Sequence, residues 1–333
     1  MNFIKSSDLR ITILLLIPGT LWGFSFLLTE IIVQTIPPFT YATLRNLLTA
    51  IPVIMMLYAR GGRLRSTWSE WRPYIFLALF GNAVPVVLTA WGQLYIDGGL
   101  TTILFSLTPL FTVLLAHYFS YNEHINGKKI FGVTLGLLGT LLLVGPSALY
   151  DVGVHLWGQL AVIGGAFSLA VSAIYVRLHF RKKAESALDS ALETLGSQFL
   201  ISIVFLLPLT LLIDQPWTLQ PSQASVIAVF ISSWGLRIGG MLTYYYLIDM
   251  VGASTASTTL DLTPINGVFW GALILSETVT WSAIVALVLI LSGVMLVNKA
   301  AAKKADLAKT ENPVAISKQS AVSSQQSAVI SDQ

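Results

Sequence analysis

Long runs of apolar residues follow one another along most of the chain, with short polar segments between them. An apolar helix needs about 20 residues to cross a hydrocarbon layer of roughly 30 Å. Continuous runs favour helices over the strands of a membrane barrel, in which apolar and polar residues alternate. The pattern predicts an all-α integral membrane protein with ten spans, at residues 11–33, 39–59, 73–95, 98–118, 128–145, 158–178, 191–213, 224–247, 251–274 and 280–298.

Two of the predicted breaks between spans are very short. Ile96-Asp97 separates the third and fourth spans, and Ile248 to Met250 separates the eighth and ninth. Such short turns predict that the helices on either side run antiparallel.

The chain also contains an internal repeat. The corresponding positions are Leu107-Thr108-Pro109-Leu110 and Leu262-Thr263-Pro264-Ile265, then Glu123 and Glu277, then Gly139 and Gly293. The register is kept over more than thirty residues, so a chance match of four letters does not explain it. We therefore expect two domains of five helices, at residues 11–145 and 158–298.

The composition agrees with a membrane protein: 55% of the residues are apolar and only 11% are charged, against about 25% charged in soluble proteins. With the N-terminus inside, 17 of the 19 Lys and Arg residues lie on the cytoplasmic side, as bacterial inner-membrane proteins require. Both termini are then cytoplasmic. Because five is an odd number, the second repeat enters the membrane from the opposite face, so the repeat is inverted.

Several function classes find no support. The four histidines are scattered, no cysteine is present, and the sequence has neither a Gly-rich phosphate loop nor a Gly-x-Ser-x-Gly motif. We expect no enzyme, metal or cofactor. Residues 299–333, without aromatic residues, predict a disordered cytoplasmic tail. The expected partners are a small-molecule substrate and the lipid bilayer, without nucleic acid, and a homodimer stays open.

The chain resembles the drug/metabolite transporter superfamily, with two EamA-type domains. The residues that carry the resemblance are Trp22-Gly23, Phe24, Phe26, Arg45 and the repeated Thr-Pro, glutamate and glycine positions. It covers residues 11–298. The resemblance implies a basket of helices around a central cavity and export or exchange of small metabolites such as amino acids, while some members handle sugars or drugs. The sixth span departs from the pattern, with Ala166-Phe167-Ser168 in place of Trp-Gly.

Two charged residues are predicted near the middle of the bilayer. Arg237 lies in the eighth span and Asp261 at a similar depth in the ninth. A charge there costs about 2.5 to 3.5 kcal/mol on insertion scales, so it should face a partner or a cavity. We expect the two to pair or to share a polar cavity in which Arg237 binds a substrate carboxylate. A structural ion pair without substrate is the alternative.

The remaining charged candidates lie near the ends of spans. Glu30 and Arg45 are placed to form a salt bridge near the outer face, either as a gate or as a permanent brace. Glu123 and Glu277 fall at opposite faces of the membrane. For these two we favour helix capping or gating over proton coupling.

Pro109 and Pro264 are expected to kink their helices, because proline cannot donate a backbone hydrogen bond. The carbonyl groups of Phe105 and Leu260 are thereby freed, either to bind substrate or to be satisfied by Thr108 and Thr263. The other candidates for the cavity wall are aromatic or amide side chains on helices that the resemblance places near it, with ordinary packing as the alternative: Trp22, Asn82, Trp91, Gln93, Tyr175, Tyr244, Asn266 and Trp270.

A secondary carrier working by alternating access is the function that the inverted repeat favours. Efflux of hydrophobic drugs is the alternative substrate class. A channel-like facilitator and a scaffold that moves no solute are the alternative function classes.

Overall fold

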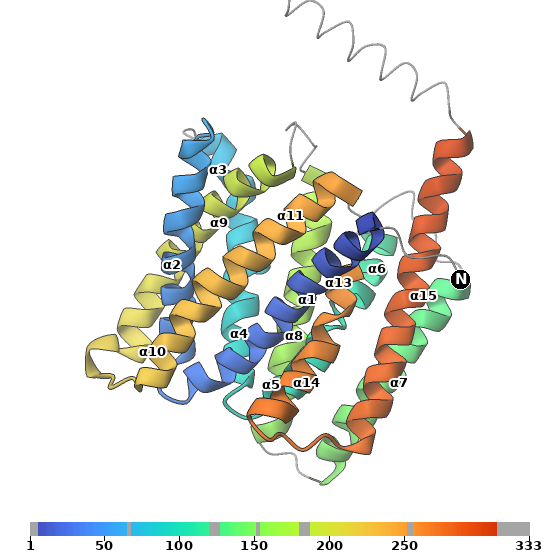
Figure 1. The fold of residues 1–333 in the computed structure, drawn as a ribbon. Helices are drawn as coiled ribbons and strands as arrows, with labels where there is room; N and C mark the ends of the chain where they lie inside the picture. Colours follow the sequence, from blue (N-terminus) through green and yellow to red (C-terminus); the bar gives the residue numbers. More distant parts are fainter. Residues whose placement is uncertain are drawn as a thin grey trace, which may run out of the picture.

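The computed structural model describes residues 6–64, 68–119, 127–150, 154–179, 187–251, 256 and 258–311, and all regular structure in this part of the chain is helical (Figure 1). The α-helices are α1 (Ser6–Val33), α2 (Pro38–Ala59), α3 (Trp68–Ala78), α4 (Val84–Gly92), α5 (Gly98–Phe105), α6 (Thr108–Phe119), α7 (Gly127–Tyr150), α8 (Val154–His179), α9 (Ala187–Leu209), α10 (Gln223–Phe230), α11 (Gly239–Val251), α13 (Thr258–Asp261), α14 (Thr263–Ile274) and α15 (Trp281–Glu311). Three π-helical segments, η1 (Leu79–Ala83), η2 (Thr210–Asp214) and η4 (Ile231–Ile238), and the 3-10 turn η3 (Pro216–Thr218) complete the set.

These elements fall at the ten predicted spans. The third span is α3, η1 and α4; the fourth is α5 and α6; the seventh is α9 and η2; the eighth is α10, η4 and α11; the ninth is α13 and α14. Within the described residues, seven helical stretches are long and apolar enough to cross a membrane, and two shorter apolar helices cover Ile130–Leu142 and Trp281–Leu296. The chain is an all-α, multi-pass membrane protein.

Two predicted boundaries are wrong. α11 covers Gly239–Val251, so Ile248 to Met250 are helical, because no glycine or proline lies between Met241 and Val251. α15 continues to Glu311, so residues 299–311 are helical rather than disordered. Their Ala, Lys and Leu residues have high intrinsic helix propensity, whereas the prediction of disorder rested on the absence of aromatic residues. The rest of the tail lies outside the described residues.

The outside of the bundle is apolar. Large side chains such as Met55, Val204 and Leu212 are 67%, 70% and 76% exposed. Apolar exposure on this scale would be costly in water and is favourable against lipid tails. This surface is therefore suited to contact the hydrocarbon layer of the membrane.

Helices from the two repeats pack in pairs that a two-fold axis would relate. α7 packs on α15 and α2 packs on α9, which are the fifth with the tenth span and the second with the seventh. The first span contacts the ninth (α1 with α14) as the sixth contacts the fourth (α8 with α6). This pattern is the one that a pseudo-symmetric pair of five-helix repeats produces.

The repeated glycines lie where α7 and α15 touch, side by side at one edge of the bundle (Figure 1). A side chain at Gly139 would collide with the carbonyl of Ala286, and one at Gly293 with the carbonyl of Gly132. Glycine at these positions lets two helix backbones approach closely, as small residues do in membrane helix pairs. The glycines of the sequence repeat thus have a packing role.

Candidate functional site

A cavity of about 630 Å³ lies between the two repeats. Helices α1, α2, α4, α5 and α6 contribute to it from the first repeat, and α8, α13, α14 and α15 from the second. Its wall is mainly aliphatic and aromatic, and its two charged residues are Arg45 and Asp261. The hydroxyl groups on the wall belong to Ser25, Thr29, Tyr41, Thr89, Thr102, Ser106, Thr108, Thr112 and Thr263.

Both copies of the Thr-Pro segment interrupt a helix at this wall. In the first copy, α5 ends at Phe105 and α6 begins at Thr108. Pro109 cannot donate to the carbonyl of Phe105, and the Thr108 hydroxyl donates to it instead at 2.7 Å. The carbonyl of Phe105 is therefore satisfied within the protein. Of the two predicted possibilities, this is the one that does not involve substrate.

The second copy is arranged differently. α13 ends at Asp261 and α14 begins at Thr263, with Pro264 on the cavity wall. The Thr263 hydroxyl oxygen is buried and has no hydrogen-bond partner. In the first break, the freed carbonyl is thus satisfied by Thr108. In the second break, Thr263 lies on the cavity wall and its buried hydroxyl is unsatisfied.

Arg45 reaches the cavity from α2. Its Nη2 donates to the Ser25 hydroxyl over a long 3.4 Å, and its guanidinium carbon lies 5.8 Å from the centre of the Tyr41 ring. Its Nε is buried without a partner. The predicted salt bridge to Glu30 is wrong, because the Glu30 carboxylate is engaged elsewhere.

Glu30 and Glu277 meet at the beginning of α5. Glu30 of α1 accepts a hydrogen bond from the Gly98 N–H at 2.6 Å, and Glu277, which follows α14, accepts one from the Gly99 N–H at 3.0 Å. The positive end of the helix dipole favours carboxylates there. Burial and then the neighbouring charge of Glu30 raise the pKa of Glu277 to about 8. Glu277 thus ties the second repeat to the first, whereas Glu123 lies outside the described residues.

Arg237 does not pair with Asp261, contrary to the prediction. It lies in η4, and its guanidinium donates to Asn46 Oδ1 at 3.2 Å and to Asn82 Oδ1 at 2.8 Å. The ring of Phe199 lies 4.3 Å from the guanidinium carbon. These partners come from α2, η1 and α9, and neither Arg237 nor Asn82 is among the residues that line the cavity. Arg237 and Asp261 were predicted at similar depth, but their side chains point to different surroundings.

Of the other sequence candidates, Trp22 lines the cavity, and four aromatic or amide residues lie behind its wall or apart from it. Tyr244 packs against Trp22 with ring centres 5.4 Å apart, and Trp270 packs edge-on against Phe24. Asn266 accepts a hydrogen bond from the Thr20 hydroxyl. Gln93 donates to the carbonyl of Phe26 at 2.9 Å. These residues position α1 rather than face the cavity.

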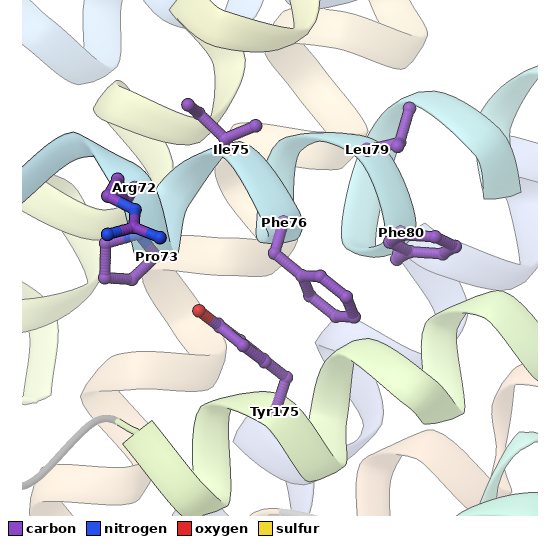
Figure 2. A pocket seen from close by; sticks show the side chains of 7 residues that line it. All are labelled: Arg72, Pro73, Ile75, Phe76, Leu79, Phe80 and Tyr175. Atoms are coloured by element: carbon purple, nitrogen blue, oxygen red, sulfur yellow. The ribbon is translucent and has the colours of Figure 1, made fainter.

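Trp91 and Tyr175 lie away from the cavity as well. Trp91 is 36% exposed and packs edge-on against Tyr95. Tyr175 of α8 belongs to a separate pocket of about 560 Å³ against α3 and η1, where its ring stacks on Phe76 and its hydroxyl points toward Arg72 (Figure 2). This pocket has neither of the two Thr-Pro helix breaks that lie on the wall of the central cavity.

The sequence reasoning missed the cavity hydroxyls and Asn46. Thr89 and Thr102 are buried polar residues inside apolar spans, and Asn46 is the residue next to Arg45. Polar residues at the depth of the two arginines were the available signal, since each must find a partner in the membrane. In the part of the chain that the structure describes, no three His, Asp or Glu side chains gather as a metal site would require.

Comparison with known proteins agrees with this architecture. The sequence profile of the EamA-like transporter family matches residues 9–145 and 156–299, which nearly coincide with the two repeats. The uncharacterized transporter YoaV of Bacillus subtilis (strain 168) is 25% identical over 283 residues, covering 83% of this chain and 92% of the relative.

Two further similarities cover most of the chain. A probable amino-acid metabolite efflux pump of Escherichia coli (strain K12) is 24% identical over 303 residues, covering 85% of this chain and 93% of the pump. A crystal structure of a protein with 19% sequence identity aligns with a TM-score of 0.59, over 86% of this chain and 97% of its own. The structural similarity shows a shared fold.

Proposed function

Because the chain belongs to the EamA-like transporter family, we propose that it is a secondary carrier that exports or exchanges small metabolites such as amino acids by alternating access. The observation that supports this most directly is the cavity between the repeats, with a broken helix from each repeat on its wall. Broken helices at a repeat interface are typical of substrate sites in secondary carriers. The positive-inside distribution favours the bacterial inner membrane with cytoplasmic termini.

The contact of Glu277 with α5 supports alternating access. The Glu277 carboxylate, which follows α14 of the second repeat, accepts a hydrogen bond from the Gly99 N–H of the first repeat. A hydrogen bond of this kind contributes about 1 kcal/mol and can break and re-form during a transport cycle. Amino acids are the first substrate class to test, because one similar protein is a probable amino-acid metabolite efflux pump.

Efflux of radiolabelled leucine and phenylalanine from proteoliposomes tests the proposal. A carrier gives a rate that saturates and that rises when unlabelled substrate is added on the other side. Ala173→Trp should block efflux because Ala173 lines the cavity, and Ile227→Trp is the matched control because Ile227 is 57% exposed on the apolar exterior. A rate that grows linearly with concentration would favour a channel, and full activity of Ala173→Trp would place the route elsewhere.

The mainly apolar wall favours a second candidate class, hydrophobic drugs. Ethidium efflux from the same proteoliposomes distinguishes the two. A drug exporter moves the dye and leaves the amino acids inside.

A further inference from the structure

We propose that Arg45 is the anion-binding residue of the central cavity and that the ligand it holds carries a carboxylate group. This assignment rests on the proposed function for its setting, since it takes the cavity to be the substrate site. It deepens that function by naming the chemical group that the protein recognises. It also transfers to Arg45 a role that the sequence had suggested for Arg237.

The hydrogen-bonding capacity of Arg45 is largely unused. A guanidinium group has five N–H donors. In Arg45 they reach one protein acceptor, the Ser25 hydroxyl at 3.4 Å, and the Nε atom is buried without any. An unsatisfied charged donor inside a membrane is costly. The geometry is that of a site completed by an acceptor that enters the cavity.

No carboxylate of the described residues forms an ion pair with Arg45. The next arginine along the chain, Arg60, does form one, with Asp189 away from the cavity. Glu30, the acid that the sequence placed near Arg45, is held at the start of α5. The charge of Arg237 lies close enough to interact with that of Arg45. Arg45 therefore brings a positive charge without a described counter-ion to a wall whose one carboxylate is Asp261.

The rest of the wall suits a carboxylate better than a more highly charged group. Arg45 is the one cation on the wall, and the planar fork of a guanidinium matches the two oxygens of a carboxylate. The aromatic rings of Phe26 and Phe105, 5.5 Å apart, offer an apolar surface for the remainder of the ligand. Thr89 and Thr263 add two buried hydroxyls without partners. An amino, hydroxy or keto acid with a small apolar body fits this set of groups.

The test compares carboxylates with their amides. Thermal stabilisation of the purified protein is measured with leucine, phenylalanine and phenylpyruvate, and with leucinamide and phenylalaninamide, alongside efflux in proteoliposomes. We expect the wild type to bind the acids at least tenfold more tightly than the amides. Arg45→Gln should lose this preference and at least 90% of efflux, and Arg45→Lys should retain only part of it because an ammonium lacks the fork. The matched control is Arg60→Gln.

The outcomes separate the two proposals. Acid binding that depends on Arg45 without any transport would contradict the proposed function and leave the carboxylate site standing. Transport of the acids by Arg45→Gln at the wild-type rate would overturn the site and leave the carrier standing. If Arg45→Gln fails to fold, the comparison of acids with amides on the wild type and on Arg45→Lys decides. An absence of any acid preference in the wild type, including no binding of either series, overturns the assignment.

Discussion

Arg45 and Arg237 are two arginines within membrane-spanning helices, and the structure surrounds them in opposite ways. Arg237 is enclosed by two asparagine side chains and the face of Phe199. Arg45 faces a cavity with one long hydrogen bond and an unpaired Nε. A charge inside a membrane is therefore informative only together with its neighbours. A satisfied arginine supports the fold, and an unsatisfied one points to a ligand.

The cluster around Arg237 contains no carboxylate among its described partners. Asn82 Nδ2 donates to Asn46 Oδ1 and to the Ser202 hydroxyl, each at 2.8 Å, and Asn82 Oδ1 accepts from Arg237. The π-helical segments η1 and η4 carry Asn82 and Arg237. Such segments turn side chains away from the regular helical positions. Neutral amides, oriented by local distortions of the helices, compensate the charge.

The largest expected effect comes from removing an amide and leaving the charge. Asn82→Ala should lower the free energy of unfolding by about 3 kcal/mol, because a buried guanidinium then lacks its best acceptor. Denaturation in mixed detergent measures the loss. Arg237→Met in the Asn82→Ala background should recover part of it, since the charge is removed as well. Equal stability of Asn82→Ala and the wild type would remove the distinction between the two arginines.

The serines beside each arginine should differ by a smaller amount. Ser202→Ala removes a fully buried hydroxyl that contacts Asn82 at 2.8 Å and backbone carbonyls at 2.8 and 3.0 Å, and should cost about 1 kcal/mol. Ser25→Ala removes only the 3.4 Å contact with Arg45 as a side-chain partner and should cost less than about 0.5 kcal/mol. The same denaturation experiment compares them. A larger loss for Ser25→Ala would mean that Arg45 is held as firmly as Arg237.

The two Thr-Pro breaks extend the comparison to the helices themselves. Thr108→Val removes the hydrogen bond to Phe105 and should cost about 1 kcal/mol of unfolding free energy. Thr263→Val replaces a hydroxyl without a partner by a methyl group and should leave the stability unchanged or raised, while it lowers efflux. When both properties are measured on the same preparations, Thr108→Val should therefore lose more stability and Thr263→Val should lose more transport. Loss of transport only in Thr108→Val would reverse the assignment of the two breaks.

The weakest of the predicted changes depends on pH and concerns Glu277, which contacts the start of α5. The pKa of Glu277 in the folded protein, about 8, lies above the ordinary glutamate pKa of 4.5, so folding favours the protonated carboxyl. The stability that this group contributes is full below pH 4.5, declines as the pH rises, and is lost above about pH 8. The melting temperature should fall across this window, by less than the pKa difference alone would give, because Glu277 is only partly buried and solvent screens its charge. Glu277→Gln should give a flatter profile, and an identical slope in both proteins would exclude Glu277 as the cause.

The sequence predicted the helices well because each span is a continuous apolar run, and lipid solvation imposes that pattern on every crossing. It also predicted the repeats, because the Thr-Pro, glutamate and glycine positions keep their register. The errors at Ile248 and in residues 299–311 occurred where polar residues were read as helix ends. Helix propensity continues through such residues when no glycine or proline intervenes.

Side-chain pairing was harder to predict than depth. Arg237 and Asp261 were predicted at similar depth, but depth does not fix the rotation of each helix about its axis, and the π-helical η4 changes that rotation within the span. Glu30 and Arg45 failed to pair for a related reason. The free backbone N–H groups of Gly98 and Gly99 bind the carboxylates of Glu30 and Glu277. A prediction that pairs only charged side chains leaves such backbone donors out.

The glycine contact between α7 and α15 has a mechanical consequence. Backbone lies directly on backbone there, so few side-chain rotamers are available to accommodate sliding of one helix along the other. We expect α7 and α15 to move together when the cavity opens. Spin labels on these two helices should then report a constant separation while labels across the cavity move apart.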